Sequence, residues 1–280
     1  MNISLDFPIE EKERLSSLLK QRGFSFRNID YSFFRAEKDG ISITLYQSGK
    51  LLIQGKEIDE IYRFIKDTFF TRKTEPWMGT DEAGKGDYFG PLVVAGVIME
   101  PEKEYVLQKL GVKDSKRLSP AKIEELAGLI RNTLPYEVII LPPKVYNDIY
   151  NEKKNLNLIL SEMHIQVIRN LLKRKGVKRV VVDKFSSTSG ISEYFKDEIK
   201  VDEIVKGERD LACAAASILA RASFEEKMRE MSKKYGFFFP KGAGKEVREA
   251  LLKFLERFPS RELKNVAKLH FRLTNGERNG

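Results

Sequence analysis

The hydrophobic periodicity of this 280-residue chain changes near residue 77, and this change restricts the folds open to it. In the first 70 residues, short alternating runs of strand type are mixed with segments of helical periodicity. Their order predicts a strand, a helix, three strands and a second helix, at residues 2–6, 8–21, 30–36, 41–47, 51–54 and 58–65. Such an order favours a small α+β domain whose antiparallel sheet carries helices on one face.

The rest of the chain alternates more regularly between strands and helices. Buried-looking strands are predicted at 77–82, 91–99, 136–141 and 178–183, and helices near 119–133, 154–174, 208–233 and 244–257. This alternation predicts an α/β domain over residues 77–280, built in layers around a mixed central sheet. The polar, proline-ended segment 71–76 is expected to link the two domains.

A run of small and charged residues separates the first two strands predicted for the second domain. It reads Gly79-Thr80-Asp81-Glu82-Ala83-Gly84-Lys85-Gly86-Asp87-Tyr88-Phe89-Gly90-Pro91. Asp81 and Glu82 end one strand, where a stiff backbone can hold two carboxylates in the fixed geometry that divalent metal ions need. The glycines that follow allow backbone N–H groups to approach a ligand closely. A metal site beside such a turn indicates chemistry on phosphate esters.

The first seven residues of this run also fit the start of a nucleotide-binding P-loop. The next position of a P-loop must be Ser or Thr, whose hydroxyl holds magnesium, and here it is Gly86. The two acids within the loop would also repel a triphosphate. The run therefore does not predict a nucleotide triphosphatase.

Two further acids occupy comparable positions. Asp183 ends an apolar strand-like run, and Glu208 stands at the entrance of a helix rich in alanine. Each has an ordinary alternative, because Asp183 can cap a turn and the helix dipole tolerates Glu208 at its start. Together with Asp81 and Glu82, however, they could hold two Mg²⁺ ions about 3.5–4 Å apart for an in-line phosphoryl displacement.

Such a site needs no histidine, and the chain has only two. His164 lies in the middle of a predicted helix, where a packing or surface role is the favoured interpretation. His270 lies near the end of the sequence and could shape an edge of the site; its role stays open. Cys213, the only cysteine, excludes a disulfide framework and is interpreted as a small buried helix residue.

The charge balance is compatible with a polyanionic partner. The chain carries 50 basic and 41 acidic residues, and because residues 1–70 carry 11 of each sign, the whole surplus lies beyond them. A basic segment with a carboxylate cluster suits nucleic acid held near metal ions, although charge that only serves solubility is an equal alternative. With no signal peptide, no apolar run near the roughly 18 residues of a membrane span and no long apolar stripe, we expect a cytoplasmic monomer.

Four ordered motifs resemble those of type 2 ribonucleases H, which remove RNA from RNA–DNA hybrids. They are Asp81-Glu82-Ala83-Gly84-Lys85-Gly86, Asp114-Ser115-Lys116-Arg117-Leu118-Ser119, Val182-Asp183, and Lys206-Gly207-Glu208 followed by Ala214-Ala215-Ala216-Ser217-Ile218-Leu219-Ala220. The resemblance covers residues 75–235 in detail. It implies a ribonuclease H-like layered fold for the domain at 77–280.

Three features resemble the ribonuclease HIII branch of this family more than the HII branch. The fourth acid is Glu208, where HII enzymes carry aspartate. Residues 1–70 have the element order of the extra N-terminal domain of HIII enzymes, which is similar to half of a TATA-binding protein. Ala243 stands where HII enzymes carry the tyrosine that reads an RNA–DNA junction. This last departure argues against efficient incision at single embedded ribonucleotides.

The resemblance implies an endoribonuclease that hydrolyses the RNA strand of RNA–DNA hybrids by two-metal-ion catalysis. The products would carry 5′-phosphate and 3′-hydroxyl ends. The residues implied to hold two Mg²⁺ or Mn²⁺ ions are Asp81, Glu82, Asp183 and Glu208. The residues implied to contact the hybrid are Gly84, Lys85 and Gly86, through backbone groups on ribose 2′-hydroxyls, and Ser115 and Lys116 near the cut.

The N-terminal domain is expected to help bind the hybrid. Strand alternation would place Tyr31, Phe33 and Arg35 on one face of its sheet, with Tyr46 beside them. Such a face could pack in the minor groove of the hybrid. The alternative is an ordinary core face that the two helices bury, and the balanced charge of the domain argues against strong phosphate binding by this domain alone.

Two other functions remain in competition with hydrolysis of hybrids. One is the HII activity, incision at lone ribonucleotides, against which Ala243 and Glu208 argue. The other is a hybrid-binding protein without catalysis, which would be expected to have lost one of the four acids, whereas all four are present. Integrase-like enzymes share a layered fold with acidic metal sites, but the order of the motifs does not favour them.

Overall fold

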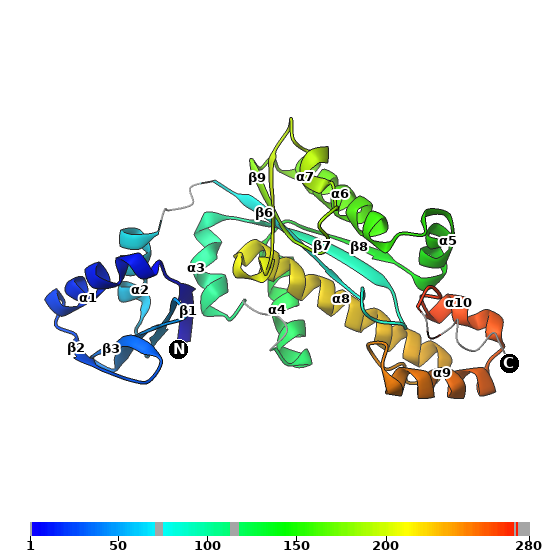
Figure 1. Cartoon of the computed structure of the whole chain (residues 1–280), viewed down its shortest axis with the longest axis horizontal. Coiled ribbons are helices and arrows are strands. Elements are labelled where there is room, and N and C mark those ends of the chain that lie inside the picture. Colours follow the sequence, from blue (N-terminus) through cyan, green and yellow to red (C-terminus); the bar gives the residue numbers. More distant parts are fainter. Residues whose placement is uncertain (1, 71–74, 113–117, 272, 274–280) are drawn as a thin grey trace. The chain divides into compact units, whose positions relative to one another are not determined.

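The computed structural model describes residues 2–70, 75–112, 118–271 and 273, which fall into two compact units (Figure 1). The first unit comprises residues 1–74 and 105–111, and the second comprises 75–104 and 112–280. Most of the predicted linker, residues 71–74, lies outside the described residues.

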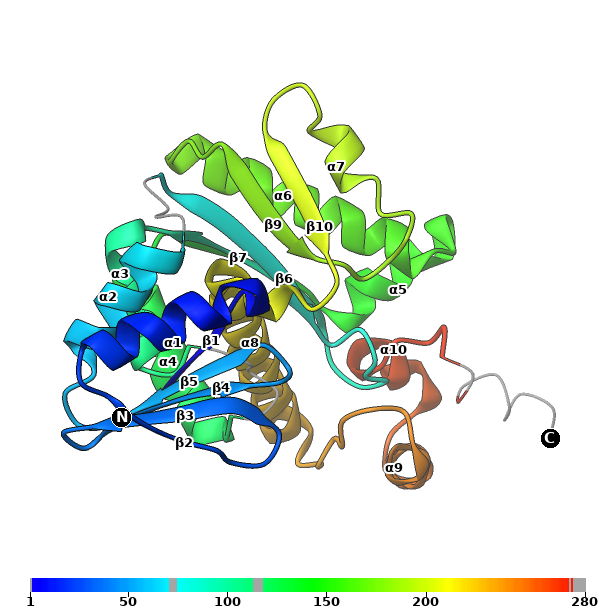
Figure 2. The same ribbon diagram turned by 60° about the vertical axis from the view of Figure 1, so that its left-hand side comes forward.

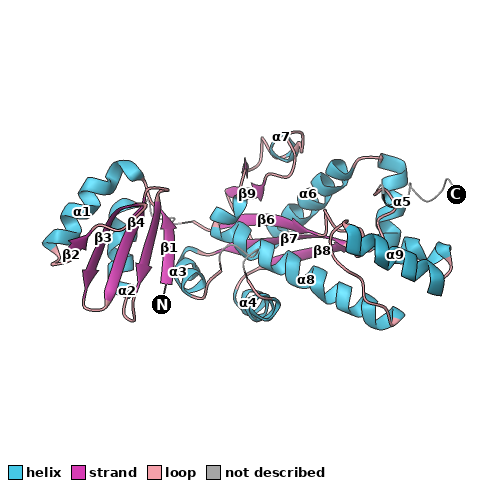
Figure 3. Cartoon of the chain, turned by 60° about the horizontal axis from the view of Figure 1, so that its bottom comes forward, coloured by secondary structure: helices cyan, strands magenta, loops and turns pink. Residues whose placement is uncertain are grey.

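The first unit contains a five-stranded antiparallel sheet in the order β1-β5-β4-β3-β2 (Figure 3). The strands are β1 (Asn2–Asp6), β2 (Ser25–Arg27), β3 (Ser32–Lys38), β4 (Ile41–Tyr46) and β5 (Lys50–Gln54). A 3₁₀ turn at Ile9–Glu11 leads into α1 (Lys12–Gln21), and α2 (Asp59–Phe69) follows the last strand. The elements predicted from the sequence are all present, and β2 is an addition that is too short to show strand alternation.

One apolar cluster holds this unit together. Inward-facing strand residues such as Ile43 and Leu45 pack with Leu15 of α1 and Ile65 of α2, and all four are fully buried. Because alternate residues of a strand face opposite sides, this cluster places both helices on the same face of the sheet. The predicted arrangement of helices on one face is therefore confirmed for the described residues.

Residues 105–111 belong to the first unit because the end of α3 (Pro101–Lys109) packs on α2. The Nζ atom of Lys109 lies 3.2 Å from both carboxylate oxygens of Asp59, and the hydroxyl of Tyr105 also donates to Asp59. These partners, Tyr105 first, lower the pKa of Asp59. Sequence patterns had placed the end of this unit at residue 70 and did not predict the return of the chain.

The second unit is built on a mixed five-stranded sheet in the order β10-β9-β6-β7-β8. The strands are β6 (Trp77–Ala83), β7 (Leu92–Met99), β8 (Tyr136–Leu141), β9 (Arg179–Asp183) and β10 (Lys200–Ile204). β6 pairs antiparallel with β7 and parallel with β9. The mixed sheet and the α/β layered fold predicted for this part of the chain are thus confirmed, and β10 is a strand that the sequence patterns missed.

Two long helices cover opposite faces of this sheet, α6 (Leu156–Arg174) on one and α8 (Leu211–Tyr235) on the other (Figures 1 and 2). The other helices are α4 (Pro120–Thr133), α5 (Pro143–Lys153), α7 (Ile191–Tyr194), α9 (Lys245–Arg257) and α10 (Leu263–Val266), with 3₁₀ turns at Gly207–Arg209 and Ser260–Glu262. The four predicted helices correspond to α4, α6, α8 and α9. Within the described part of the chain, no helix combines the length and the apolar character that crossing a membrane requires.

A buried lysine ties the segment that follows α10 to the turn between β6 and β7. Lys268 is fully buried, and its Nζ atom donates to the carbonyl oxygens of Gly90 at 2.7 Å and Pro91 at 3.3 Å. Its backbone N–H donates to the carbonyl of Tyr88 at 2.8 Å. The segment after α10 therefore supports the backbone that leads out of the glycine-rich turn.

Replacement of this lysine by methionine, Lys268→Met, should remove a measurable pH dependence of stability. Burial lowers the pKa of Lys268 to about 7, against 10.5 in the unfolded chain. Between these values the unfolded chain binds a proton that the folded protein does not. The free energy of unfolding of the wild type should therefore rise with pH over this window, by up to roughly 1.4 kcal/mol per pH unit.

Urea unfolding of the wild type and of Lys268→Met at several pH values from 7 to 10 measures this contribution. The free energy of unfolding of the wild type minus that of the variant should become more positive as the pH rises. A difference that stays constant over this range would contradict the lowered pKa.

Candidate functional site

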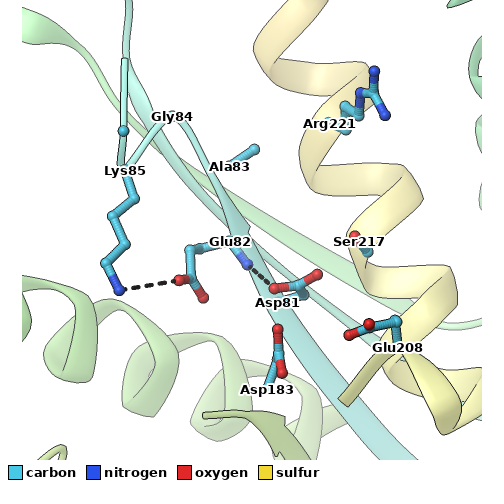
Figure 4. Close-up of a pocket in the computed structure, with 10 residues that line it drawn as sticks. Asp81, Glu82, Ala83, Gly84, Lys85, Asp183, Glu208, Ser217 and Arg221 are labelled. Atoms are coloured by element: carbon cyan, nitrogen blue, oxygen red, sulfur yellow. Dashed lines mark hydrogen bonds and ion pairs between the residues drawn. The ribbon is translucent and has the colours of Figure 1, made fainter. Parts of the chain in front are cut away.

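A cavity of about 490 Å³ in the second unit brings the four predicted acids together (Figure 4). Because β6 and β9 are parallel neighbours, the ends of both strands lie at the same edge of the sheet. This places Asp81 and Glu82 beside Asp183, and Glu208 reaches the cavity from the turn before α8. The residues that line the cavity are Asp81, Glu82, Ala83, Gly84, Lys85, Gly86, Asp183, Glu208, Ser217 and Arg221.

Strand alternation sends the two adjacent acids of β6 in different directions. Asp81 shares the α8 face with Gly79, and its carboxylate hydrogen-bonds to the Ser217 hydroxyl of α8. Glu82 points to the α6 face, where His164 of α6 lies. Figure 4 accordingly shows Asp81, Asp183 and Glu208 pointing toward a common space, while Glu82 turns toward Lys85. The strand thus brings one carboxylate to each side of its own end.

The electrostatics of the cavity make an unpaired negative charge on Asp81 unfavourable. Asp81 is 9% exposed, and burial, followed by repulsion from Glu82 and Asp183, raises its pKa to about 8. The hydrogen bond from Ser217 and the N–H of Glu82, 2.8 Å from Oδ1, act in the opposite direction. A cation among these carboxylates would offset the repulsion and favour the ionised form.

The carboxylates are near one another without forming a ready-made coordination sphere. Among the described residues, no group of three or more His, Cys, Asp or Glu side chains is arranged to hold a metal ion. Two basic residues, Lys85 and Arg221, line the same cavity as the acids, and the Nζ atom of Lys85 lies 3.8 Å from Oε1 of Glu82. Carboxylate oxygens remain the donors that Mg²⁺ and Mn²⁺ prefer, so the chemistry of the four acids suits such ions.

Asp183 is held by the backbone of the turn that carries Glu208. The N–H of Gly207 donates to Oδ1 of Asp183 at 2.7 Å. A Cβ atom on Gly207 would lie 2.8 Å from the Cα atom of Asp183, so only glycine permits this approach. Asp183 therefore caps a turn, which was the ordinary role considered for it, and it lines the cavity as well.

Glu208 stands just before helix α8, in the short turn that leads into it. Helix α8 begins at Leu211 rather than at residue 208, because Gly207–Arg209 forms a separate 3₁₀ turn. The N-cap is Asp210, whose Oδ1 accepts the N–H of Ala212 at 2.9 Å and the indole N–H of Trp77 at 2.9 Å. Helix α8 thus begins three residues after the approximate start predicted near 208, with Glu208 at its entrance as predicted and lining the cavity.

The glycine-rich turn lies at the rim of the cavity. Gly84 has a φ of +89°, and a Cβ atom there would approach the carbonyl oxygen of Pro91 at 2.3 Å. After the turn, Oδ1 of Asp87 accepts the N–H of Gly242 at 2.6 Å, and the N–H of Tyr88 donates to the carbonyl of Gly242 at 2.8 Å. The loop that contains Ala243 is therefore attached to the turn whose backbone faces the cavity.

Two residues of the cavity were missed as site residues from the sequence. Ser217 and Arg221 lie four positions apart on α8, so they share one face of that helix, and both line the cavity. His164, interpreted as a packing or surface residue, is fully buried, and its Nε2 atom lies 3.4 Å from Glu82 Oε2. The i, i+4 spacing of Ser217 and Arg221 was the one signal available, but it does not tell which face of α8 meets the sheet.

Two other predictions can be located only in part. Ser115 and Lys116 lie outside the described residues, which omit 113–117. His270 does not line the cavity: its Nδ1 atom lies 3.1 Å from the Tyr146 hydroxyl, and its ring packs on Tyr150 at 4.5 Å between centroids. Burial, and then the charge of Lys268, lower the pKa of His270 to about 4.

The aromatic face expected on the first unit does not form as strand alternation predicted. An irregularity between Ser32 and Phe34 shifts the register, so that Arg35 pairs with Thr44 while Phe33 packs against the apolar cluster. Tyr31 is 82% exposed with a φ of 59° in the turn before β3. Tyr46, at the end of β4, is half-buried and pairs with Ser32. Tyr31 therefore does not share a strand face with Phe33 and Arg35, because it lies in the turn before β3, and the irregularity at Phe33 interrupts the period of two beside it.

Comparison with protein families gives two matches along the chain. A family model described as ribonuclease HII matches residues 78–274, which contain the cavity. A second model, a domain of unknown function (DUF3378), matches residues 11–66. Each match falls in the part of the chain that forms one of the two sheets.

Individual proteins resemble the chain over almost its whole length. A ribonuclease HIII of Protochlamydia amoebophila is 38% identical, over 96% of this chain and 93% of the relative. A ribonuclease HIII of Streptococcus gordonii is 36% identical, over 86% of each. A crystal structure of Bst-RNase HIII in complex with Mn²⁺ is 27% identical with a TM-score of 0.70, covering 98% of this chain and 97% of the other.

Proposed function

The chain belongs to the ribonuclease HII family, in its ribonuclease HIII branch, and we propose that it hydrolyses the RNA strand of RNA–DNA hybrids with two divalent metal ions, leaving 5′-phosphate and 3′-hydroxyl ends. One observation carries the proposal. Four carboxylates from two strand ends and one turn meet at a single cavity, next to a glycine turn whose backbone faces the same space.

The residues that would hold the ions are Asp81, Glu82, Asp183 and Glu208. Their fit to divalent cations rests on the charge of the cavity, since burial and the neighbouring acids raise the pKa of Asp81. Bound ions would activate a water molecule and stabilise the leaving oxygen of an in-line displacement. Mn²⁺ was found in a related structure, that of Bst-RNase HIII, and Mg²⁺ takes the same oxygen ligands.

The chain's own residues orient these carboxylates. Ser217 and the N–H of Glu82 hold Asp81, and the N–H of Gly207 holds Asp183. All three partners come from rigid elements or tight turns, so the protein itself limits how the Asp81 and Asp183 carboxylates can rotate.

Recognition of RNA is assigned to the backbone of Gly84, Lys85 and Gly86. These residues line the cavity beside the acids, and the positive φ of Gly84 turns the chain there. Backbone groups at such a turn can contact the ribose 2′-hydroxyl, which separates RNA from DNA. Ser115 and Lys116 keep their proposed contact with the nucleic-acid backbone on the strength of their motif alone.

We propose that the first unit contributes to hybrid binding through Tyr31 and Tyr46 individually, and not through one shared aromatic face of its sheet. Among the aromatic residues that the structure describes, Tyr31 has the most exposed side chain. Tyr46 is half-buried and lies at the end of β4. Phe33 contributes mainly to packing, with the Lys12 ammonium 4.7 Å from its ring centroid.

The test is cleavage of two labelled substrates, one an RNA strand paired with DNA and the other a DNA duplex with one embedded ribonucleotide. With Mg²⁺ or Mn²⁺, we expect efficient cleavage of the hybrid only, because Ala243 offers no aromatic ring to read the junction. Removal of the ions by EDTA should abolish cleavage. Failure to cut the hybrid with either ion would overturn the proposal, and efficient cutting of the second substrate would overturn the role given to Ala243.

A further inference from the structure

A histidine on the helix behind the cavity faces the strand that carries the acids. His164 lies in the middle of α6 and is fully buried. Its Nδ1 atom lies 2.9 Å from the hydroxyl oxygen of Thr80, and its Nε2 atom lies 3.4 Å from Oε2 of Glu82. One imidazole ring thus reaches two side chains of β6.

The geometry follows from the period of the strand. Thr80 and Glu82 are two positions apart on β6, so both side chains point to the face that α6 covers, whereas Asp81 between them points to α8. The ring of Phe185, just beyond β9, stacks on the His164 ring with 5.0 Å between centroids and 16° between planes. The imidazole is therefore held in its plane while its two nitrogens point along the strand.

Two buried polar atoms lie opposite each other where His164 meets Glu82. Within the described residues, Oε2 of Glu82 and Nε2 of His164 are both buried and have no hydrogen-bond partner. An unpaired polar atom in the interior is unfavourable, so two complementary ones that face each other stabilise the fold when they approach. If the Thr80 hydroxyl donates to Nδ1, the ring proton sits on Nε2 and points toward Oε2.

We propose that His164 is a positioning residue for Glu82. It holds the buried oxygen Oε2 through its Nε2–H group, so that Oε1 is the oxygen left for a divalent ion. This inference rests on the proposed function, in which Glu82 is a metal ligand. It assigns to His164 no contact with substrate and no transfer of a proton.

A second contact explains why the histidine is needed. Oε1 of Glu82 lies 3.8 Å from the Nζ atom of Lys85, on the glycine turn that is proposed to bind the hybrid. Lys85 also donates to the carbonyl of Phe185 at 3.0 Å. Lys85 attracts Oε1 toward the turn, as the dashed contact in Figure 4 shows. His164, by holding Oε2, limits how far the carboxylate can rotate away from the other acids.

The experiment compares His164→Gln with His164→Asn. The amide nitrogen of glutamine can reach the position of Nε2, whereas that of asparagine ends near Nδ1 and cannot reach Glu82. Mn²⁺ affinity is measured by titration calorimetry, kcat and KM on a labelled RNA–DNA hybrid are determined, and thermal unfolding without metal serves as the check of folding.

We expect His164→Asn to weaken Mn²⁺ binding and lower kcat by roughly 10- to 100-fold, the range seen when a partner of a metal ligand is lost. KM for the hybrid should stay within about twofold because His164 does not touch substrate. His164→Gln should recover most of both losses. Equal Mn²⁺ affinities and equal kcat values for the two variants would overturn the inference, whether both match the wild type or both are impaired.

A matched control separates this inference from the proposed function. Glu82→Gln should lose Mn²⁺ affinity and cleavage at least as severely as His164→Asn. Unchanged affinity and cleavage in Glu82→Gln would overturn the metal site itself. A severe loss in Glu82→Gln, with His164→Asn and His164→Gln both like the wild type, would overturn only the role of His164. His270→Asn, which alters the other histidine away from the cavity, should leave Mn²⁺ affinity unchanged.

Discussion

Asp81→Asn should abolish nearly all cleavage of an RNA–DNA hybrid while the protein still folds and still binds the hybrid. The substitution keeps the shape of the side chain and its hydrogen bonds to Ser217 and to the N–H of Glu82. It removes one negative charge from the centre of the four acids. Since ions at such a site supply several kcal/mol of transition-state stabilisation, the loss in kcat should be at least roughly 10³-fold.

The same variant has a second consequence, which does not depend on activity. Asp81 has a pKa near 8 in the folded protein and near 3.8 when unfolded, so the folded protein holds a proton that the unfolded chain loses. Without metal ions, the free energy of unfolding of the wild type should therefore fall as the pH rises from about 4 to 8. Asp81→Asn lacks this contribution, so its stability relative to the wild type should increase over the same range.

The measurements are single-turnover cleavage, hybrid binding by anisotropy in the presence of EDTA, and urea unfolding at pH 5 and pH 8. Asp197→Asn, which changes an exposed acid that does not line the cavity, is the matched control and should behave like the wild type. Near-normal turnover in Asp81→Asn would rule out its role as a metal ligand. Parallel pH profiles of stability would rule out the raised pKa.

Gly79→Ala should destabilise the protein severely although it adds a single methyl group. Gly79 lies on β6 directly under α8, and a Cβ atom there would lie 2.1 Å from the backbone nitrogen of Cys213 and 2.2 Å from the carbonyl carbon of Ala212. Neither backbone atom can move without shifting the helix. We expect a loss of more than about 4 kcal/mol in the free energy of unfolding, the range reached only by severe clashes or buried defects.

Gly128→Ala is the control for this prediction, because it makes the same chemical change at a position where the added methyl group has free space. Gly128 lies within α4, and nothing is found within 4 Å of an added Cβ atom. Alanine there should raise the free energy of unfolding by about 0.5–1 kcal/mol, the usual difference between the two residues in a helix. Thermal and urea unfolding of both variants measures the contrast, and a Gly79→Ala protein as stable as Gly128→Ala would show that α8 does not pack on β6 this closely.

A clash at Gly79 would also reach the cavity. Asp81 follows two positions later on the same face of β6, and Ser217 stands one turn along α8 from Cys213. A helix displaced from Gly79 would move Ser217 away from Asp81. If enough Gly79→Ala folds to be assayed, its kcat should fall together with its stability.

Much of the fold could be predicted because it depends on local periodicity. The strands β6, β7, β8 and β9 were recognisable from apolar runs, and the turns between β3, β4 and β5 from their residue types. Elements without a distinct pattern were not predicted: β2 has three residues, and the five residues of β10 (Lys200–Ile204) do not alternate, because two charged residues, Asp202 and Glu203, stand side by side. The bulge at Phe33 escaped as well, because one extra residue in a strand leaves no mark in composition.

The four acids could be predicted as candidates because each stands at a strand end or beside a tight turn, where a carboxylate needs a partner. Their assembly could not be derived from periodicity. It depends on the parallel pairing of β6 with β9, and on the closeness of Gly207 to Asp183, which places Glu208 at the cavity. The resemblance of the motifs supplied this grouping, and the structure supplies its physical reason.

By itself, the sequence determined where strands, helices and the glycine turn lie, and which acids stand at their ends, because a side-chain period is a property of one segment. Only the tertiary structure decided what meets across segments. It placed His164 between Thr80 and Glu82, Ser217 beside Asp81, and Lys268 beneath the turn at Gly90. These contacts depend on which face of a helix packs on which side of a sheet, and that choice is made by the packing of the whole unit.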